Sequence, residues 1–143
     1  QRAAMGTSSL LNETLTRVEA LQRAIDQTSV ADDRLATDAR ALERRLRDIQ
    51  MLLSGDATLS RRQEATPPSL LKRLNGITTG LWSNTLDAPT NTQRRQYDIV
   101  SAEFEKILAQ LRPLVETELR RIEDAAEAAG APWTTGRIPS WRP

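Results

Sequence analysis

The sequence has no histidine and no cysteine among its 143 residues. Histidine is the commonest general base near neutral pH, cysteine supplies the thiol nucleophile, and both are the usual ligands of zinc. Without them, the residue types that most often carry catalysis and structural zinc are missing, and no disulfide framework can form. The composition therefore favours a protein without catalytic chemistry, and it leaves the cellular compartment open.

Aromatic residues are scarce, at 3% of the chain, which argues against a β-sandwich or barrel, where Phe, Tyr and Trp are enriched. Residues that form helices readily, namely Ala, Leu, Arg and Glu, dominate instead. The charges nearly cancel, with 20 Lys and Arg against 19 Asp and Glu. A net charge of +1 provides no general attraction to nucleic acid or to an anionic membrane, so neither is expected as a partner.

Long apolar runs are also missing: none approaches the ~20 residues that span a bilayer, so membrane insertion is not expected. No signal peptide is present either. The chain opens with Gln-Arg-Ala-Ala-Met over residues 1–5, which is typical of the middle of a longer protein. The missing signal therefore says nothing about the parent protein.

The sequence does contain apolar residues at helical spacing. The clearest stripe alternates steps of four and three residues and comprises Leu35, Ala39, Leu42, Leu46, Ile49 and Leu53. It predicts a helix that follows a capping box over residues 29–32 and ends at Gly55. A first helix is expected over residues 9–27, after a flexible lead-in of residues 1–8. The short connection predicts that these two helices form an antiparallel hairpin.

A third helix is expected to follow Thr66, with Pro67 at its first helical position. Its apolar stripe comprises Leu70, Leu74, Ile77 and Leu81. Proline suits the first turn because the amide hydrogen that it lacks would have no partner there in any case.

A capping box formed by Thr90 and Gln93 predicts the start of a long fourth helix, which continues to Ala129. Pro113 lies inside it and cannot donate a hydrogen bond to the carbonyl of Ala109, so a kink or break is expected there. The sequence thus predicts an all-α fold, an antiparallel bundle of about four helices. Residues 1–143 are expected to form a single domain.

The C-terminal residues 131–143 are expected to be irregular. They contain Trp133, Ile138 and Trp141, and this apolar content predicts that the tail packs back onto the bundle. Trp82 lies at the end of the third helix. We expect the three tryptophans to anchor loops, each indole N–H donating to a carbonyl. The alternative is that their exposed faces stack on sugar rings and form a carbohydrate-binding patch.

The densest acidic groups are Asp32 with Asp33 and Glu123 with Asp124 and Glu127. Catalysis would require two carboxylates that face one cleft with separated pKa values. Adjacent residues of a helix point in different directions, and Glu123 and Glu127 are expected on a solvated face opposite the apolar stripe. No calcium-loop, phosphate-loop or serine-nucleophile motif is present. No catalytic, metal or cofactor site is therefore predicted.

From Gly55 onward, several short motifs follow one another in a recognisable order. They are Gly55-Asp56, Arg61-Arg62, Thr66-Pro67-Pro68-Ser69, Trp82-Ser83, Ala88-Pro89-Thr90 with Gln93 and Tyr97, Gly130-Ala131-Pro132-Trp133-Thr134, and Trp141. Over residues 30–143 the chain resembles the C-terminal helical region of bacterial sortilin-like, BNR-repeat "glycosyl hydrolase" proteins. The resemblance implies a β-propeller before this segment and a periplasmic or extracellular parent.

The resemblance carries over no catalytic residue, because Asp-box repeats of the propeller, S-x-D-x-G-x-T-W, do not occur in this chain. It implies a non-catalytic module that packs against the propeller or binds a partner protein. The long fourth helix adds a further expectation. Its stripe around Leu119 and Ile122 would need cover from the tail or from another chain, which would include a homodimer. The family name suggests another alternative, in which the chain is an accessory part of a glycoside hydrolase.

Overall fold

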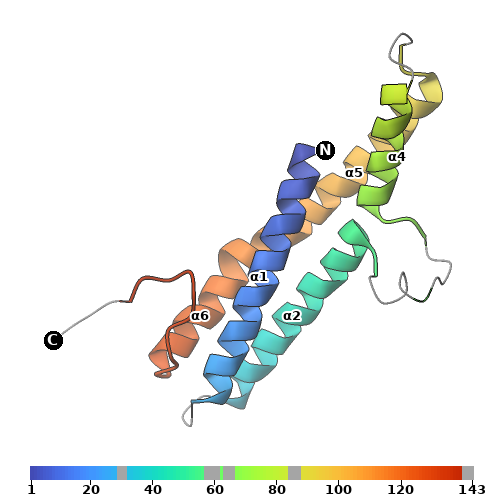
Figure 1. Cartoon of the computed structure of the whole chain (residues 1–143). Coiled ribbons are helices and arrows are strands. Elements are labelled where there is room, and N and C mark those ends of the chain that lie inside the picture. The colour runs from blue at the N-terminus through green and yellow to red at the C-terminus, as the bar shows by residue number, and fades with distance from the viewer. Residues whose placement is uncertain (29–31, 57–61, 63–66, 84–87, 140–143) are drawn as a thin grey trace. The chain divides into compact units, whose positions relative to one another are not determined.

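The computed structural model describes residues 1–28, 32–56, 62, 67–83 and 88–139, with the backbone alone for 81–83. Figure 1 shows its helices, which are α1 Arg2–Asp26, α2 Asp33–Ser54, α4 Leu70–Ser83, α5 Asn91–Pro113 and α6 Leu119–Ala128. One π-helical turn, η1, covers Leu114–Glu118 between α5 and α6. The described residues contain no strand. The predicted all-α fold is therefore confirmed.

The chain divides into two compact units. Unit 1 comprises Gln1–Ser9 and Asp48–Gln110, and unit 2 comprises Leu10–Arg47 and Leu111–Pro143. Both units are helical in their described residues, and each contains part of α1, part of α2 and part of the helical run from α5 to α6.

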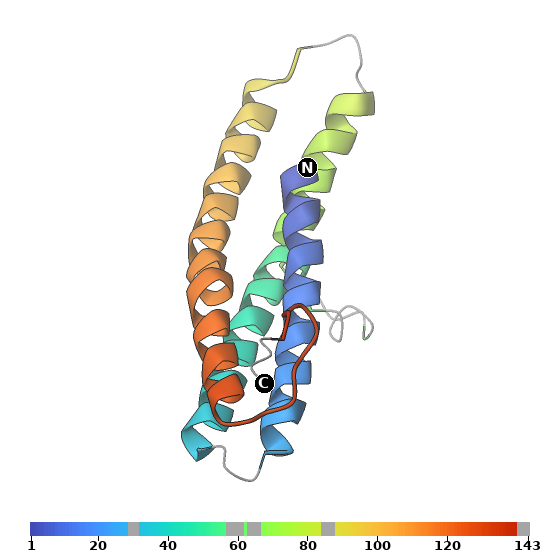
Figure 2. The same ribbon diagram turned by 90° about the vertical axis from the view of Figure 1, so that its left-hand side faces the viewer.

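In unit 2, α1 and α2 form the predicted antiparallel hairpin. Gln22 Nε2 donates to Glu43 Oε2 at 2.8 Å, and Arg47 Nη2 donates to Glu19 Oε1 at 2.9 Å. The partner's number rises as the α1 residue's number falls, which is the register of antiparallel helices. Figure 2 shows these parts of α1 and α2 side by side at the bottom of the view.

The apolar stripes of the helices in unit 2 pack together and form its core. Its buried side chains include Leu11, Leu15, Val18, Leu21, Ile25, Leu35, Ala39, Leu42, Leu46, Leu111, Leu114, Leu119, Ile122 and Ala126. Each fully buried Leu, Ile or Val contributes about 1.5–3 kcal/mol relative to exposure. This burial is what stabilises helices whose polar faces offer little tertiary contact.

Unit 1 contains a second hairpin, formed by α4 and α5. Arg73 of α4 pairs with Glu103 of α5, and the side chain of Gln93 lies nearest to Gly80, so these two helices also run antiparallel. Among its described residues, the buried apolar side chains of unit 1 are Ala4, Ile49, Leu53, Leu70, Leu74, Ile77, Val100 and Ile107. Leu81, the last residue of the predicted α4 stripe, has its side chain outside the described part.

The first helix is longer than predicted. It begins at Arg2, so residues 2–8 are helical and do not form the expected flexible lead-in. Ala4 and Thr7 are buried and extend the apolar stripe that continues at Leu11. The Thr7 hydroxyl is satisfied because it donates to the Ala3 carbonyl at 2.9 Å. This burial offsets the roughly 1 kcal/mol that a glycine such as Gly6 costs inside a helix.

The second and third helices begin later than predicted. Asp32 caps α2, since its carboxylate accepts the N–H of Arg34 at 3.1 Å; Ser29, the expected cap, lies outside the described residues. Ser69 caps α4, since its hydroxyl accepts the N–H of Lys72 at 3.3 Å. Pro67 does not open the helix, because a residue that precedes another proline is disfavoured in the helical region.

The capping box of α5 is confirmed. The N–H of Gln93 donates to Thr90 Oγ1 at 3.3 Å, and the N–H of Thr90 donates to Gln93 Oε1 at 2.9 Å. Two amide hydrogens that the first helical turn cannot satisfy are thereby paired reciprocally.

At Pro113 the helical backbone neither stops nor continues as a regular α-helix. It widens into the π turn η1, in which the N–H of Leu119 donates to the carbonyl of Leu114. Proline has no amide hydrogen for the bond that the α-helix requires at this place. A π turn holds one extra residue and so absorbs the interruption without ending the helix.

The helix α6 ends in a Schellman motif. Gly130 has φ of +81°, its N–H donates to the Glu127 carbonyl at 2.9 Å, and the N–H of Ala131 donates to the Ala126 carbonyl at 2.9 Å. The described tail beyond it is irregular, as predicted. However, Ile138 is 93% exposed, so it does not help the tail to pack.

Candidate interaction surface

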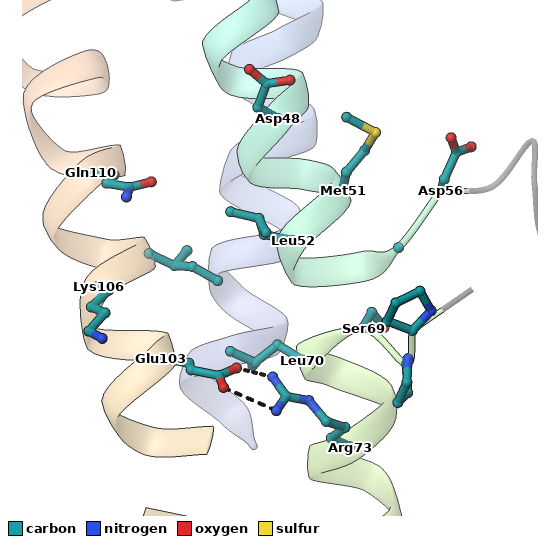
Figure 3. Close-up of a pocket in the computed structure, with 14 residues that line it drawn as sticks. Asp48, Met51, Leu52, Asp56, Ser69, Leu70, Arg73, Glu103, Lys106 and Gln110 are labelled. Atoms are coloured by element: carbon teal, nitrogen blue, oxygen red, sulfur yellow. Dashed lines mark hydrogen bonds and ion pairs between the residues drawn. The ribbon is translucent and has the colours of Figure 1, made fainter. Parts of the chain in front are cut away.

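Unit 1 contains a groove with a volume of about 680 Å³. It lies between the end of α2, the beginning of α4 and the second half of α5 (Figure 3). Its lining residues are Asp48, Met51, Leu52, Gly55, Asp56, Pro67, Pro68, Ser69, Leu70, Arg73, Glu103, Lys106, Ile107 and Gln110. The volume lies within the range of sites that hold small molecules or the side chains of a partner.

Apolar side chains make up much of this groove. Leu70 and Ile107 are buried at its base, whereas Met51 is 47% exposed and Leu52 is 56% exposed on α2. The sequence stripe explains the difference, because Ile49 and Leu53 fill the core position on α2 and leave the intervening residues outside. Two large adjacent apolar residues beside a hollow are typical of a surface that a partner covers.

An ion pair closes one side of the groove. Arg73 Nη1 donates to Glu103 Oε1 at 3.2 Å, and Arg73 Nη2 donates to Glu103 Oε2. This is the bidentate geometry in which a guanidinium matches a carboxylate. The two charges therefore neutralise each other and hold α4 and α5 together. Arg73 Nε is buried and has no hydrogen-bond partner among the described residues.

Gly55 shapes the rim where α2 ends. Its φ is +85°, and its N–H donates to the Met51 carbonyl at 2.9 Å. A Cβ at this position would lie 3.4 Å from the Cβ of Ser69, the residue that caps α4. Glycine thus permits both the left-handed turn and the close approach of the two helix ends.

A second, smaller hollow of about 300 Å³ also lies between α4 and α5. It is lined by Arg73, Gly76, Ile77, Gln96, Ile99 and Val100, and Ile99 is 49% exposed. No side chain fills the place beside Gly76, where an added Cβ would meet nothing within 4 Å among the described residues.

In unit 2, the most conspicuous polar feature is the buried ion pair of Arg17 and Glu123. Arg17 Nε donates to Glu123 Oε1 at 2.5 Å and Arg17 Nη2 donates to Glu123 Oε2 at 2.8 Å. The Glu123 side chain is 2% exposed and that of Arg17 is 32% exposed. The prediction that Glu123 lies on a solvated face is therefore wrong. It stands four residues after Leu119 and three before Ala126, both buried, so it lies on the buried stripe and needs a cation to be stable there.

The tail covers this ion pair through its backbone. Gly136, with φ of +97°, lies so close to Arg17 that a Cβ would stand 3.4 Å from the guanidinium carbon. Next to it, Arg137 Nη2 donates to Asp124 Oδ1 and to Glu127 Oε2, both at 2.8 Å. Polar contacts therefore hold the described part of the tail, where apolar packing was expected.

A further polar layer links α1 and α2 in unit 2. Hydrogen bonds from Gln22 and then from Arg47 lower the pKa of Glu43 below its ordinary value, against a smaller opposing effect of burial. The bond to Glu43 in turn raises the pKa of Arg47. These contacts stabilise the charged forms and so fix the register of the hairpin.

The tryptophans do not come together as a described site. Trp141 lies outside the described residues, and so does the side chain of Trp82. Trp133 is 40% exposed, and the guanidinium of Arg137 lies over its ring at 5.2 Å from the centroid. That cation–π contact occupies a face that a sugar ring would need. Carbohydrate binding by the tryptophans stays a prediction.

Leu119 and Ile122 were expected to need cover from the tail or another chain. They are 1% and 0% exposed, so unit 2 already covers them and they offer no surface to a partner. Sequence reasoning missed the groove of unit 1 instead. The signal for it was the run from Met51 to Leu53, in which three apolar residues follow one another although a helix buries only one side.

The described residues contain no group of three or more acidic side chains that could hold a metal ion. No described helix is long and apolar enough to cross a membrane. Comparison of the chain with family models, with curated proteins and with solved structures gave no match.

Proposed function

We propose that this chain is a non-catalytic interaction module, and that the groove of unit 1 is the surface through which it contacts another protein surface. The observation that carries the proposal is the pair of half-exposed side chains, Met51 and Leu52, beside an apolar hollow of about 680 Å³. Covering such a patch removes apolar area from water, which is the main favourable term in protein association.

The proposal extends to the parent protein. The resemblance to the C-terminal helical region of sortilin-like, BNR-repeat proteins supports a larger exported parent in which a β-propeller precedes this module. In that setting the module acts by packing against the propeller or by binding a partner protein. Arg73 and Glu103, which neutralise each other, hold the α4 and α5 walls of the groove together.

A single introduced cysteine tests whether the groove is covered, because the natural chain has none. In Met51→Cys, we expect a maleimide to label the dilute 143-residue chain rapidly. Labelling should slow several-fold in a longer chain that carries the proposed propeller before Gln1, or when the short chain is concentrated. The reagent reports access to the groove, since Met51 is half exposed and its replacement leaves the core intact.

Glu105→Cys is the matched control. Glu105 is exposed on the same unit but does not line the groove, so its labelling rate should be the same in every sample. Equal rates for Met51→Cys in the dilute, the concentrated and the longer chain would contradict the proposed function.

A further inference from the structure

Two opposite charges stand on different walls of the groove in unit 1. Asp48 belongs to α2 and Lys106 belongs to α5, and Figure 3 shows them on opposite sides of Leu52. Both are exposed, and no ion pair joins either of them to another described residue. Arg73 and Glu103, by contrast, neutralise each other. Asp56 also lines the groove, and it already takes part in another interaction. Asp48 on the α2 wall and Lys106 on the α5 wall are thus an anion and a cation that can face a partner.

The apolar part of the groove is divided in a similar way. The α2 wall contributes a ridge, Met51 and Leu52, that is open to solvent. Leu70 of α4 and Ile107 of α5 are buried and line the same hollow. One surface therefore carries both half-exposed apolar side chains and a hollow that could receive such side chains from a second copy.

A surface with these paired features is complementary to itself. In a two-fold symmetric dimer the same patch faces its own copy, so that residue i meets residue j and residue j meets residue i. We propose that a second copy of this chain occupies the groove, with Asp48 of each copy opposite Lys106 of the other and Leu52 of each in the hollow of the other. This inference rests on the proposed function of the groove as an interaction surface and names the partner.

The charge of the whole chain agrees with this partner. The net charge is +1, so two copies repel each other only weakly at neutral pH. A small anionic or cationic ligand would need one sign of charge in the groove, but Asp48 and Lys106 supply one of each. A second copy pairs with both charges at once, because its own Lys106 and Asp48 face them.

Charge reversal tests the arrangement. In the homodimer of Asp48→Lys, two lysines face each other at both contacts; in that of Lys106→Glu, two acids do so. Each variant alone should self-associate roughly tenfold more weakly than the natural chain, since both contacts of the dimer change from attraction to repulsion between exposed charges. Sedimentation velocity over a concentration series measures the dissociation constants. Both residues are exposed, so circular dichroism should show an unchanged fold.

The decisive sample is an equal mixture of the two variants. In the mixed dimer, the introduced lysine of the first variant faces the introduced glutamate of the second, and the natural Lys106 of the first faces the natural Asp48 of the second. We therefore expect the mixture to dimerise about as tightly as the natural chain. An effect of charge reversal within one chain could not be rescued by mixing. Asp98→Lys and Arg95→Glu, exposed changes on α5 outside the groove, should leave self-association as it is in the natural chain.

A natural chain that stays monomeric at every concentration would overturn the second-copy inference, and so would a mixture that associates no better than either variant. The proposed function would still stand if the thiol of Met51→Cys were protected in the longer chain. Loss of that protection as well would overturn both.

Discussion

Glu123 and Arg17 show at the residue scale how a charge can belong to a core. A buried carboxylate without a partner costs several kcal/mol, whereas the exposed end of Arg17 can return to water. We therefore expect Arg17→Met to lower the free energy of unfolding by about 3 kcal/mol, because it leaves Glu123 buried without a cation. Glu123→Gln should cost less, about 1–2 kcal/mol, because it keeps a hydrogen-bonding side chain of the same shape. Denaturant unfolding measures both.

The exposed pair of Arg45 and Glu118, at 2.9 Å, is the matched control in the same unit. Their side chains are 55% and 37% exposed, so Arg45→Ala should change stability by less than about 1 kcal/mol. If Arg17→Met cost no more than Arg45→Ala, the ion pair would not be what stabilises Glu123 in the core.

At the element scale, the π turn after Pro113 keeps α6 in phase with the last residues of α5, from Leu111 onward, in the core of unit 2. The apolar stripe runs through Leu114 and resumes at Leu119, a step of five where an α-helix requires three or four. With Pro113→Ala in place, deleting the exposed Glu116 should shorten the step to four and restore a regular helix. We expect the free energy of unfolding to change by about 1 kcal/mol or less, since every buried residue keeps its face.

Deleting Glu105 in the same background is the control. It removes an equally exposed residue from the regular helix α5, so the two sides of the deletion rotate by about 100° relative to each other. Leucines on one side then leave the core, and the cost should be several kcal/mol. Equal costs for the two deletions, measured by denaturant unfolding, would contradict the role of η1 as an extra residue.

The spacing of the apolar residues along each helix explains which elements the sequence could predict and which it could not. Strong stripes with steps of three and four predicted α2 and the capping box predicted the start of α5, because both signals are local. The π turn was missed because Val115 could be taken as the next apolar residue before Leu119, which hides the step of five. Glu123 was misplaced because a charge was assigned to water, although it stands four residues after Leu119 and three before Ala126, both of which are buried.

The run from Met51 to Leu53 indicates an exposed apolar patch on α2, but no local signal predicts the hollow beside it. Its walls come from α2, α4 and α5, which are distant in the sequence, and only the packing of unit 1 brings Asp48, Leu52 and Lys106 to one surface. Residue type identified the tryptophans as candidates because their rings are large and often functional. The structure instead exposes aliphatic side chains beside a hollow, a property of tertiary arrangement that composition does not reveal.

At the scale of the whole molecule, self-association and stability are linked by mass action. If two natural chains bind each other only when folded, raising the concentration favours the folded state and raises the thermal midpoint.

Leu52→Asp places a charge on the proposed contact and should abolish this concentration dependence. Because Leu52 is 56% exposed, the midpoint of the dilute variant should stay close to that of the dilute natural chain. Tyr97→Asp, an equally exposed change outside the groove, should keep the concentration dependence. Scanning calorimetry over a hundredfold range of protein concentration measures this dependence. Over that range, mass action changes the stabilisation of the folded state by up to about 3 kcal/mol. The same slope in all three chains would place any association elsewhere than in the groove.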